Sequence, residues 1–147
     1  MKRLLVFDFD GVLAIKYSMP EECYQQIPEL LKQLSKTHIL CVASYNPRAQ
    51  MAIKSWGLDQ YFSCMRFGAN HTWKDEYQEH YRELMSKSDQ IVNMIENEIK
   101  ELDHQYSDIV FFDDSEENLK CVNEKLPHVK TVLVKDEFGF RLNDIPI

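Results

Sequence analysis

Near its start the sequence reads Leu4-Leu5-Val6-Phe7-Asp8-Phe9-Asp10-Gly11-Val12-Leu13, and the rest of the chain is organised around this stretch. A run of apolar residues predicts a fully buried strand, and Gly11 allows the backbone to turn away after it. Side chains alternate along a strand, so Asp8 and Asp10 are expected on the same side. Two such close carboxylates repel unless a cation lies between them or one keeps its proton. The stretch therefore predicts a functional site, and the alternative is that the aspartates only end a strand and open a turn.

Length and composition favour one globular domain. The chain has 147 residues, of which 44% are hydrophobic and 28% charged. This length can bury one core and is too short for two, and the composition is close to that of globular proteins. We therefore expect residues 1–147 to form a single domain.

Charge and cysteine content narrow the class of partner. The net charge is -7 and no stretch concentrates Lys and Arg, so the sequence does not favour nucleic acid as a partner. The cysteines at positions 23, 41, 64 and 121 are too far apart for a zinc site and indicate the reduced thiols of a cytosolic protein. No apolar run approaches the length of about 18 residues that a membrane span needs, and the N-terminus lacks a signal-peptide pattern. We expect a cytoplasmic protein without a membrane partner.

The first half of the chain alternates helices with strands. Proline suits the first turn of a helix, so a helix is predicted from Pro28 to about Lys36. A second buried strand follows at His38–Ala43 and delivers Ser44 at its carboxyl end. Asn46-Pro47 predicts a helix start, with asparagine as the N-cap. That helix should bury Met51, Ala52 and Trp56 and stop at Gly57, and Tyr61–Phe67 should form a third strand.

The second half continues the alternation after an irregular segment. Residues 68–86 predict a loop and a small helical insert, and a helix is expected at about 88–103. Ile109–Phe112 predicts another buried strand, which ends in Asp113-Asp114. Ser115 should cap the next helix, and Val129–Val134 should form the last strand.

Strands separated by helices indicate a parallel sheet with right-handed crossovers, that is, a doubly wound, Rossmann-like α/β domain. Ligands bind beyond the carboxyl ends of such strands. Polar residues of three strands should meet at this edge: Asp8 and Asp10, then Ser44, then Asp113 and Asp114. So many carboxylates need a hard cation, and oxygen ligands without a Cys or His cluster point to Mg²⁺ rather than zinc.

Four motifs carry a resemblance to a known family. Asp8-Phe9-Asp10-Gly11-Val12-Leu13 resembles the first motif of the haloacid dehalogenase (HAD) superfamily of phosphohydrolases, although many members have Thr at the place of Val12. Ser44 resembles motif II, and Phe-Phe-Asp-Asp-Ser-Glu-Glu-Asn at 111–118 resembles the acidic motif IV of the small magnesium-dependent phosphatases. Motif III is a lysine near a helix start. Lys87 opens the helix before the motif IV strand and is preferred to Lys74.

The resemblance implies hydrolysis of a phosphate monoester through an aspartyl-phosphate. Asp8 would be the nucleophile and Asp10 the general acid and base. Ser44 and Lys87 would hold the phosphate. Mg²⁺ would bind Asp8, the backbone carbonyl of Asp10 and Asp114, with Asp113 acting through water or as an anchor for Lys87.

Other functions stay open at this point. Dehalogenases of the superfamily characteristically lack the second aspartate, so Asp10 disfavours that branch. A phosphorylation-switch module has its acidic residues in the reverse order along the chain, and a catalytically silent phosphate-binding domain would share every motif. Turnover of an aryl phosphate would separate the enzyme from both.

The resemblance is to members without a cap domain. Only 33 residues separate Asp10 from Ser44, and about twenty separate the third strand from Lys87, too few for a folded cap. Such members act on large or exposed phosphorylated groups, or close their site with a partner subunit, so a homodimer stays open. In the absence of a cap, residues 68–86 are the candidate lid, with His71 and Trp73 as candidate specificity residues.

Overall fold

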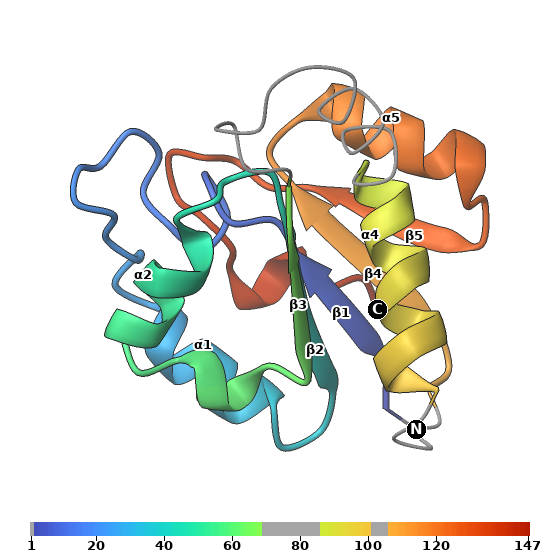
Figure 1. The fold of residues 1–147 in the computed structure, drawn as a ribbon, viewed down its shortest axis with the longest axis horizontal. Helices are drawn as coiled ribbons and strands as arrows, with labels where there is room; N and C mark the ends of the chain where they lie inside the picture. Colours follow the sequence, from blue (N-terminus) through green and yellow to red (C-terminus); the bar gives the residue numbers. More distant parts are fainter. Residues whose placement is uncertain (1, 69–85, 101–105) are drawn as a thin grey trace.

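The computed structural model describes residues 2–68, 86–100 and 106–147. They form a five-stranded parallel sheet in the order β3-β2-β1-β4-β5 (Figure 1). The strands are β1 (Leu4–Phe7), β2 (Ile39–Ser44), β3 (Cys64–Phe67), β4 (Ile109–Asp113) and β5 (Val129–Leu133). The order reverses beside β1, because the chain first builds β2 and β3 on one side and then β4 and β5 on the other. The predicted α/β class with a parallel sheet is confirmed.

Helices cover both faces of the sheet, as expected for a doubly wound domain (Figure 1). The helices are α1 (Ile27–Leu34), α2 (Ala49–Ser55), α4 (Lys87–Met94) and α5 (Glu116–Lys125). Successive strand residues point to opposite faces. Leu5 and Phe7 therefore pack with the buried residues of α1 and α2, whereas Leu4 and Val6 pack with those of α4 and α5. The central strands are buried on both sides, which explains their continuous apolar sequences.

On the first face, α1 agrees with the predicted helix and α2 begins later than predicted. Pro28 lies in the first turn of α1, as expected. Asn46 is not the N-cap of α2, which is Arg48; instead Asn46 Oδ1 accepts a hydrogen bond of 2.9 Å from the Arg48 amide. The buried face consists of Ala49, Ala52 and Ile53, so the prediction that Met51 is buried is wrong: its side chain is 77% exposed.

On the second face, Ser86 caps α4 by accepting a hydrogen bond from the Asp89 amide. The helix continues as a π-helical turn, η2 (Ile95–Ile99), instead of running regularly toward residue 103. Ser115 caps α5 as predicted, accepting from the Asn118 amide. Both caps place a helix N-terminus beside the carboxyl edge of the sheet.

The C-terminal segment closes the first face. Phe140 packs edge-on against Phe7 and Phe112, with ring centroids 4.8 and 4.9 Å away. Short 3-10 turns, η1 (Asp59–Tyr61) and η3 (Leu142–Asp144), complete the regular structure of the described residues. The predicted insert at 68–86 lies almost wholly outside these residues, and so do Lys74, His71 and Trp73.

The cysteines and the length of the helices complete the description. All four cysteines have free thiols, and Cys41 and Cys64 face one another across β2 and β3 with their sulfur atoms 3.3 Å apart. Within residues 2–68, 86–100 and 106–147, no helix has the length and apolar character that a membrane crossing requires.

Candidate active site

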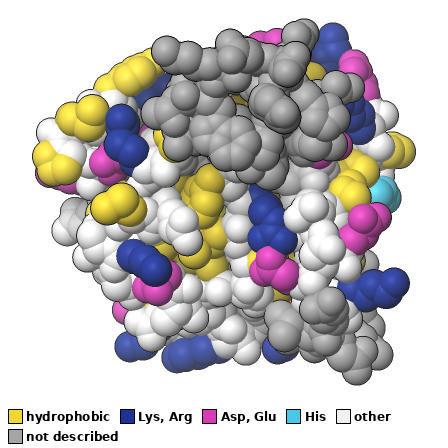
Figure 2. Space-filling model, in the orientation of Figure 1, with side chains coloured by type: hydrophobic (Ala, Val, Ile, Leu, Met, Phe, Trp, Pro, Cys, Tyr) yellow, Lys and Arg dark blue, Asp and Glu magenta, His cyan; other side chains and the backbone are white. Residues whose placement is uncertain are grey.

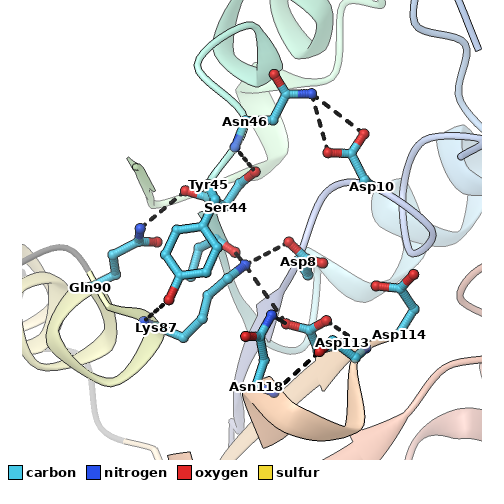
Figure 3. A network of polar contacts seen from close by, with 12 residues as sticks. Asp8, Asp10, Ser44, Tyr45, Asn46, Lys87, Gln90, Asp113, Asp114 and Asn118 are labelled. Atoms are coloured by element: carbon cyan, nitrogen blue, oxygen red, sulfur yellow. Dashed lines mark hydrogen bonds and ion pairs between the residues drawn. The ribbon is translucent and has the colours of Figure 1, made fainter. Parts of the chain in front are cut away.

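The carboxyl ends of β1, β2 and β4 bring the expected polar residues together, because these three strands are neighbours in the sheet. Figure 3 shows Asp8 and Asp10 after β1, Ser44 at the end of β2, and Asp113 and Asp114 at the end of β4. Lys87, the first residue of α4, reaches into the same group. All six sequence-predicted site residues therefore lie in one site.

A buried ion pair of the site joins Lys87 to Asp8. Lys87 Nζ donates hydrogen bonds of 2.6 Å to Asp8 Oδ1 and 2.6 Å to the carbonyl oxygen of Ala43. The lysine side chain is only 2% exposed. A buried ammonium group is costly unless it is paired and hydrogen-bonded, so Asp8 and the carbonyl together hold this cation in place.

The start of α4 is fixed by Tyr45, the residue after Ser44. The Tyr45 hydroxyl accepts a 3.0 Å hydrogen bond from the Lys87 backbone amide. The Tyr45 ring lies 4.8 Å from Lys87 Nζ, in the range of a cation–π contact. Tyr45 therefore contacts both the start of α4 and the side chain of its first residue.

Asp113 is fully buried and receives hydrogen bonds on both carboxylate oxygens. Oδ1 accepts from the Ser115 amide at 2.9 Å, and Oδ2 accepts from Asn118 Nδ2 at 3.1 Å. Lys87 Nζ lies 3.7 Å from Oδ2. Burial first, and then the Asp8 carboxylate, raise the pKa of Asp113 to about 7. A cation among these carboxylates would favour their charged forms.

Asp114 faces Lys16, a residue that the sequence did not mark. Lys16 Nζ lies 2.8 Å from Asp114 Oδ2 and 3.5 Å from Asp136 Oδ2. Gly11 explains how the first loop passes so close: its φ is +78°, and a Cβ built there would lie 2.4 Å from Asp114 Oδ2. The position requires glycine both for its conformation and for its space.

The Asp10 carboxylate turns away from the other carboxylates and toward β2 (Figure 3). Asn46 Nδ2 donates to both of its oxygens, at 3.2 and 3.4 Å. Burial is the main cause that raises the pKa of Asp10, and the hydrogen bond from Asn46 opposes it. Asp8 and Asp114 raise it further. A carboxyl group with a raised pKa is suited to give and take a proton.

Ser44 is buried, and its hydroxyl oxygen accepts a 2.9 Å hydrogen bond from the Asn46 amide. This bond uses a lone pair, so the hydroxyl can still donate its own hydrogen. The Ser44 carbonyl accepts a 3.0 Å hydrogen bond from Gln90 Nε2 of α4. The end of β2 is thus tied to the helix that carries Lys87.

The donor set fits a hard divalent cation. Asp8, Asp113 and Asp114 each offer a carboxylate oxygen, and these atoms lie within 4.8 Å of one another. Oxygen ligands of this kind suit Mg²⁺. Because both oxygens of Asp113 accept hydrogen bonds from the protein, Asp8 and Asp114 are the better candidates for direct ligands.

A hollow of about 610 Å³ opens beside this group of carboxylates. Asp10 and Asn46 are among the residues that line it. Tyr17 and Met19 of the loop after β1 and Tyr45 after β2 also line it. The hollow therefore borders the carboxyl group that is best suited to proton transfer.

Comparison with known proteins identifies the fold. No family model matches the chain, and no curated protein matches it. A haloacid dehalogenase-like hydrolase from Streptococcus pneumoniae superposes with a TM-score of 0.65 at 14% identity, over 97% of this chain and 90% of that one. The fold is that of the HAD-like hydrolases.

Two other solved structures have the same HAD fold. A Clostridium difficile protein for which phosphatase activity has been proposed has a TM-score of 0.67 at 14% identity, covering 94% of this chain and 87% of that one. The N-terminal part of a Bacteroides fragilis protein, which contains a phosphatase domain complexed with Mg, has a TM-score of 0.63 at 16% identity. The superposition covers 98% of this chain and 39% of the Bacteroides fragilis chain.

Sequence reasoning missed three residues that shape this site: Lys16, Tyr45 and Asn46. The sequence predicts a helix cap at Asn46, and the position of Asn46 two residues after Ser44 is the signal that places it at the same sheet edge. Asn118 was noted as part of the motif IV pattern, and it lies one helical turn after the Ser115 cap. Nothing in the sequence pairs Lys16 with Asp114, 98 positions later.

Proposed function

We propose that the protein is a magnesium-dependent phosphatase that hydrolyses a phosphate monoester through a covalent aspartyl-phosphate on Asp8. The observation that carries this proposal is the contact of 2.6 Å between Lys87 Nζ and Asp8 Oδ1 inside a cluster of oxygen ligands. The HAD-like fold and the acidic cluster support it, and so does the magnesium complex of the Bacteroides fragilis relative.

In the first step, a carboxylate oxygen of Asp8 attacks phosphorus, and the bond from phosphorus to the ester oxygen breaks. Lys87 and the Ser44 hydroxyl would hold the equatorial phosphoryl oxygens, on which negative charge collects in the transition state. Lys87 is already positioned by Tyr45 and Ala43, so little reorganisation is needed when the phosphate binds.

Asp10 would give its proton to the leaving alkoxide. In the second step Asp10 would take a proton from water, which attacks the phosphorus of the aspartyl-phosphate; the bond from phosphorus to Asp8 breaks, inorganic phosphate is released and the Asp8 carboxylate is regenerated. Asn46 holds the Asp10 carboxyl group by both oxygens and so orients it toward the hollow.

Asp8, Asp114 and the backbone carbonyl of Asp10 would hold Mg²⁺, with Asp113 as the anchor that orders Lys87 and the start of α5. When bound, the cation would offset the charge of the carboxylates and of the phosphate and polarise the phosphoryl group. Asp113 is suited to the anchoring role, because Ser115 and Asn118 fix both of its oxygens.

Hydrolysis of an activated aryl phosphate tests the proposal. Activity should vanish in chelator, return with Mg²⁺ and respond only marginally to zinc. Asp8→Asn should keep the fold and abolish turnover, because an amide is a poor nucleophile and a weaker ligand. Turnover of Asp8→Asn within about tenfold of the wild type would contradict the assignment of the nucleophile.

A further inference from the structure

The hollow beside Asp10 lies where the alcohol part of a substrate must be. If Asp10 protonates the leaving oxygen, the group attached to that oxygen extends from Asp10 into the hollow, which Asp10 and Asn46 help to line. A volume of about 610 Å³ lies in the range of small-molecule sites, roughly 300 to 1,000 Å³. The hollow can therefore hold a whole organic group and not only a methyl or a water.

Its walls present apolar surface to solvent. Tyr17 is 91% exposed, Met19 72% and Tyr45 43%. Figure 2 shows hydrophobic side chains gathered at the left-hand edge of this face, over the connection between β1 and α1. Side chains this exposed contribute little to the core, so their burial is left for a bound group to provide.

The conformation of Tyr17 agrees with a role in binding. Its φ is +66°, in the left-handed region that a bulky residue rarely adopts. Such backbone strain concentrates at ligand-contacting segments. Here it holds an aromatic ring outside the protein body, on the wall of the hollow.

The cations of the hollow already have partners of opposite charge. Lys16 pairs with Asp114 and Asp136, and Arg48 pairs with Glu21. A second anionic group on the substrate would have to displace a carboxylate from one of these cations. The charges thus favour a leaving group without charge.

An aromatic ring is the neutral group that these walls recognise best. Tyr17 and Tyr45 offer ring faces and edges, and the thioether of Met19 makes favourable contacts with aromatic rings. We infer, on the basis of the proposed phosphatase function, that the substrate is a phosphate monoester whose neutral alcohol part carries an aromatic ring, bound in the hollow against Tyr17, Met19 and Tyr45.

The test compares 2-phenylethyl phosphate with 2-cyclohexylethyl phosphate, whose saturated ring has the same number of carbon atoms. Both are esters of primary alcohols with the same charge, so a difference in kcat/KM reports the ring and not the acidity of the leaving group. We expect the phenylethyl ester to be preferred about tenfold, because its ring makes several aromatic and sulfur contacts with the walls of the hollow.

Variants of Tyr17 test whether the aromatic ring of this residue causes the preference for the phenylethyl ester. Tyr17→Asn should reduce the preference about three- to tenfold, because asparagine accepts the left-handed backbone but offers no ring. Tyr17→Phe should keep the preference. Met51→Ser removes an equally exposed apolar side chain outside the hollow and should change neither rate.

The inference would be overturned by equal kcat/KM values for the two esters, or by a Tyr17→Asn variant that loses kcat/KM to the same extent on both. Titration of the unreactive 2-phenylethylphosphonate and 2-cyclohexylethylphosphonate by calorimetry makes the result independent of turnover. Failure to hydrolyse any ester would refute the proposed phosphatase function. In that case tighter binding of the phenylethyl compound, lost in Tyr17→Asn, would still support the aromatic site, and equal binding would overturn it.

Discussion

The side-chain amide of Asn46 spans both carboxylate oxygens of Asp10, at 3.2 and 3.4 Å, although 36 positions separate the two residues. The same asparagine accepts a hydrogen bond from the Arg48 amide and donates its own backbone amide to Ser44 Oγ. Asn46 therefore couples the end of β2, the approach to α2 and the proposed general acid.

Removing this amide should impair proton transfer more than binding. Asn46→Ala should lower kcat about tenfold to a hundredfold for esters with poor leaving groups and less for an activated aryl phosphate, whose oxygen needs little protonation. Asp10→Asn should lower kcat further on both substrates, and again more for esters with poor leaving groups than for the aryl phosphate. Initial rates on an alkyl and an aryl ester provide the measurement, and equal losses on both esters for Asp10→Asn would mean that Asp10 is not the acid.

Lys87 should prove essential to turnover. Lys87→Met removes the cation that faces Asp8 and would stabilise the transition state, so kcat/KM should fall about a hundredfold or more. The variant should also lose about 3 kcal/mol in the free energy of unfolding, because Asp8 and Asp113 stay buried without their ammonium partner. Urea unfolding and steady-state kinetics measure the two effects.

Lys54→Met, at an exposed position of α2, provides the matched control and should resemble the wild type. Lys74→Met tests the alternative motif III lysine. A collapse of turnover in Lys74→Met with normal rates in Lys87→Met would contradict the assignment.

Replacing Asp114 should mainly weaken Mg²⁺ binding, whereas replacing Asp113 should mainly lower the stability of the fold. Asp114→Ala should weaken Mg²⁺ binding about tenfold or more, measured by calorimetric titration, and raise the concentration needed for activity. Asp113→Ala should weaken Mg²⁺ binding less and lower stability more, since Asp113 accepts hydrogen bonds from Ser115 and Asn118. The reverse order would show that the direct and indirect ligands are exchanged.

Asp108, remote from the site, should make stability depend on pH. Arg3 donates to it at 2.9 and 3.1 Å and Lys130 at 2.9 Å, and the hydrogen bond with Arg3 is the main cause that lowers the pKa of Asp108 well below its usual range. A lowered pKa stabilises the folded state above the unfolded value of about 3.9, and this contribution is lost as the pH falls through the folded pKa.

Asp108→Asn should therefore cost about 1 to 2 kcal/mol at neutral pH. The difference from the wild type should be constant from about pH 5 to 8 and shrink below about pH 4. Urea unfolding across this range is the measurement, and a difference that persists unchanged at pH 3 would argue against the ion pair as its cause.

The sheet and the meeting of Asp8, Ser44 and Asp113 could be predicted, because buried strands have continuous apolar sequences and parallel strands present their carboxyl ends at one edge. The start of α2 could not, because Asn46 Oδ1 accepts the Arg48 amide in a turn that precedes the helix, and the helix begins only at Ala49. Its buried face then moves from Met51 to Ile53. The contact between Lys16 and Asp114 depends on the path of a loop, which leaves no periodic pattern in the sequence.

The position of β1 links catalysis to the stability of the whole molecule. Its residues are at most 1% exposed and pair with β2 on one side and β4 on the other. A central strand of this kind exchanges its amide hydrogens only when the domain opens globally. The nucleophile at its end should consequently keep its place until the domain unfolds, and on slow heating enzymatic inactivation should coincide with the calorimetric transition instead of preceding it.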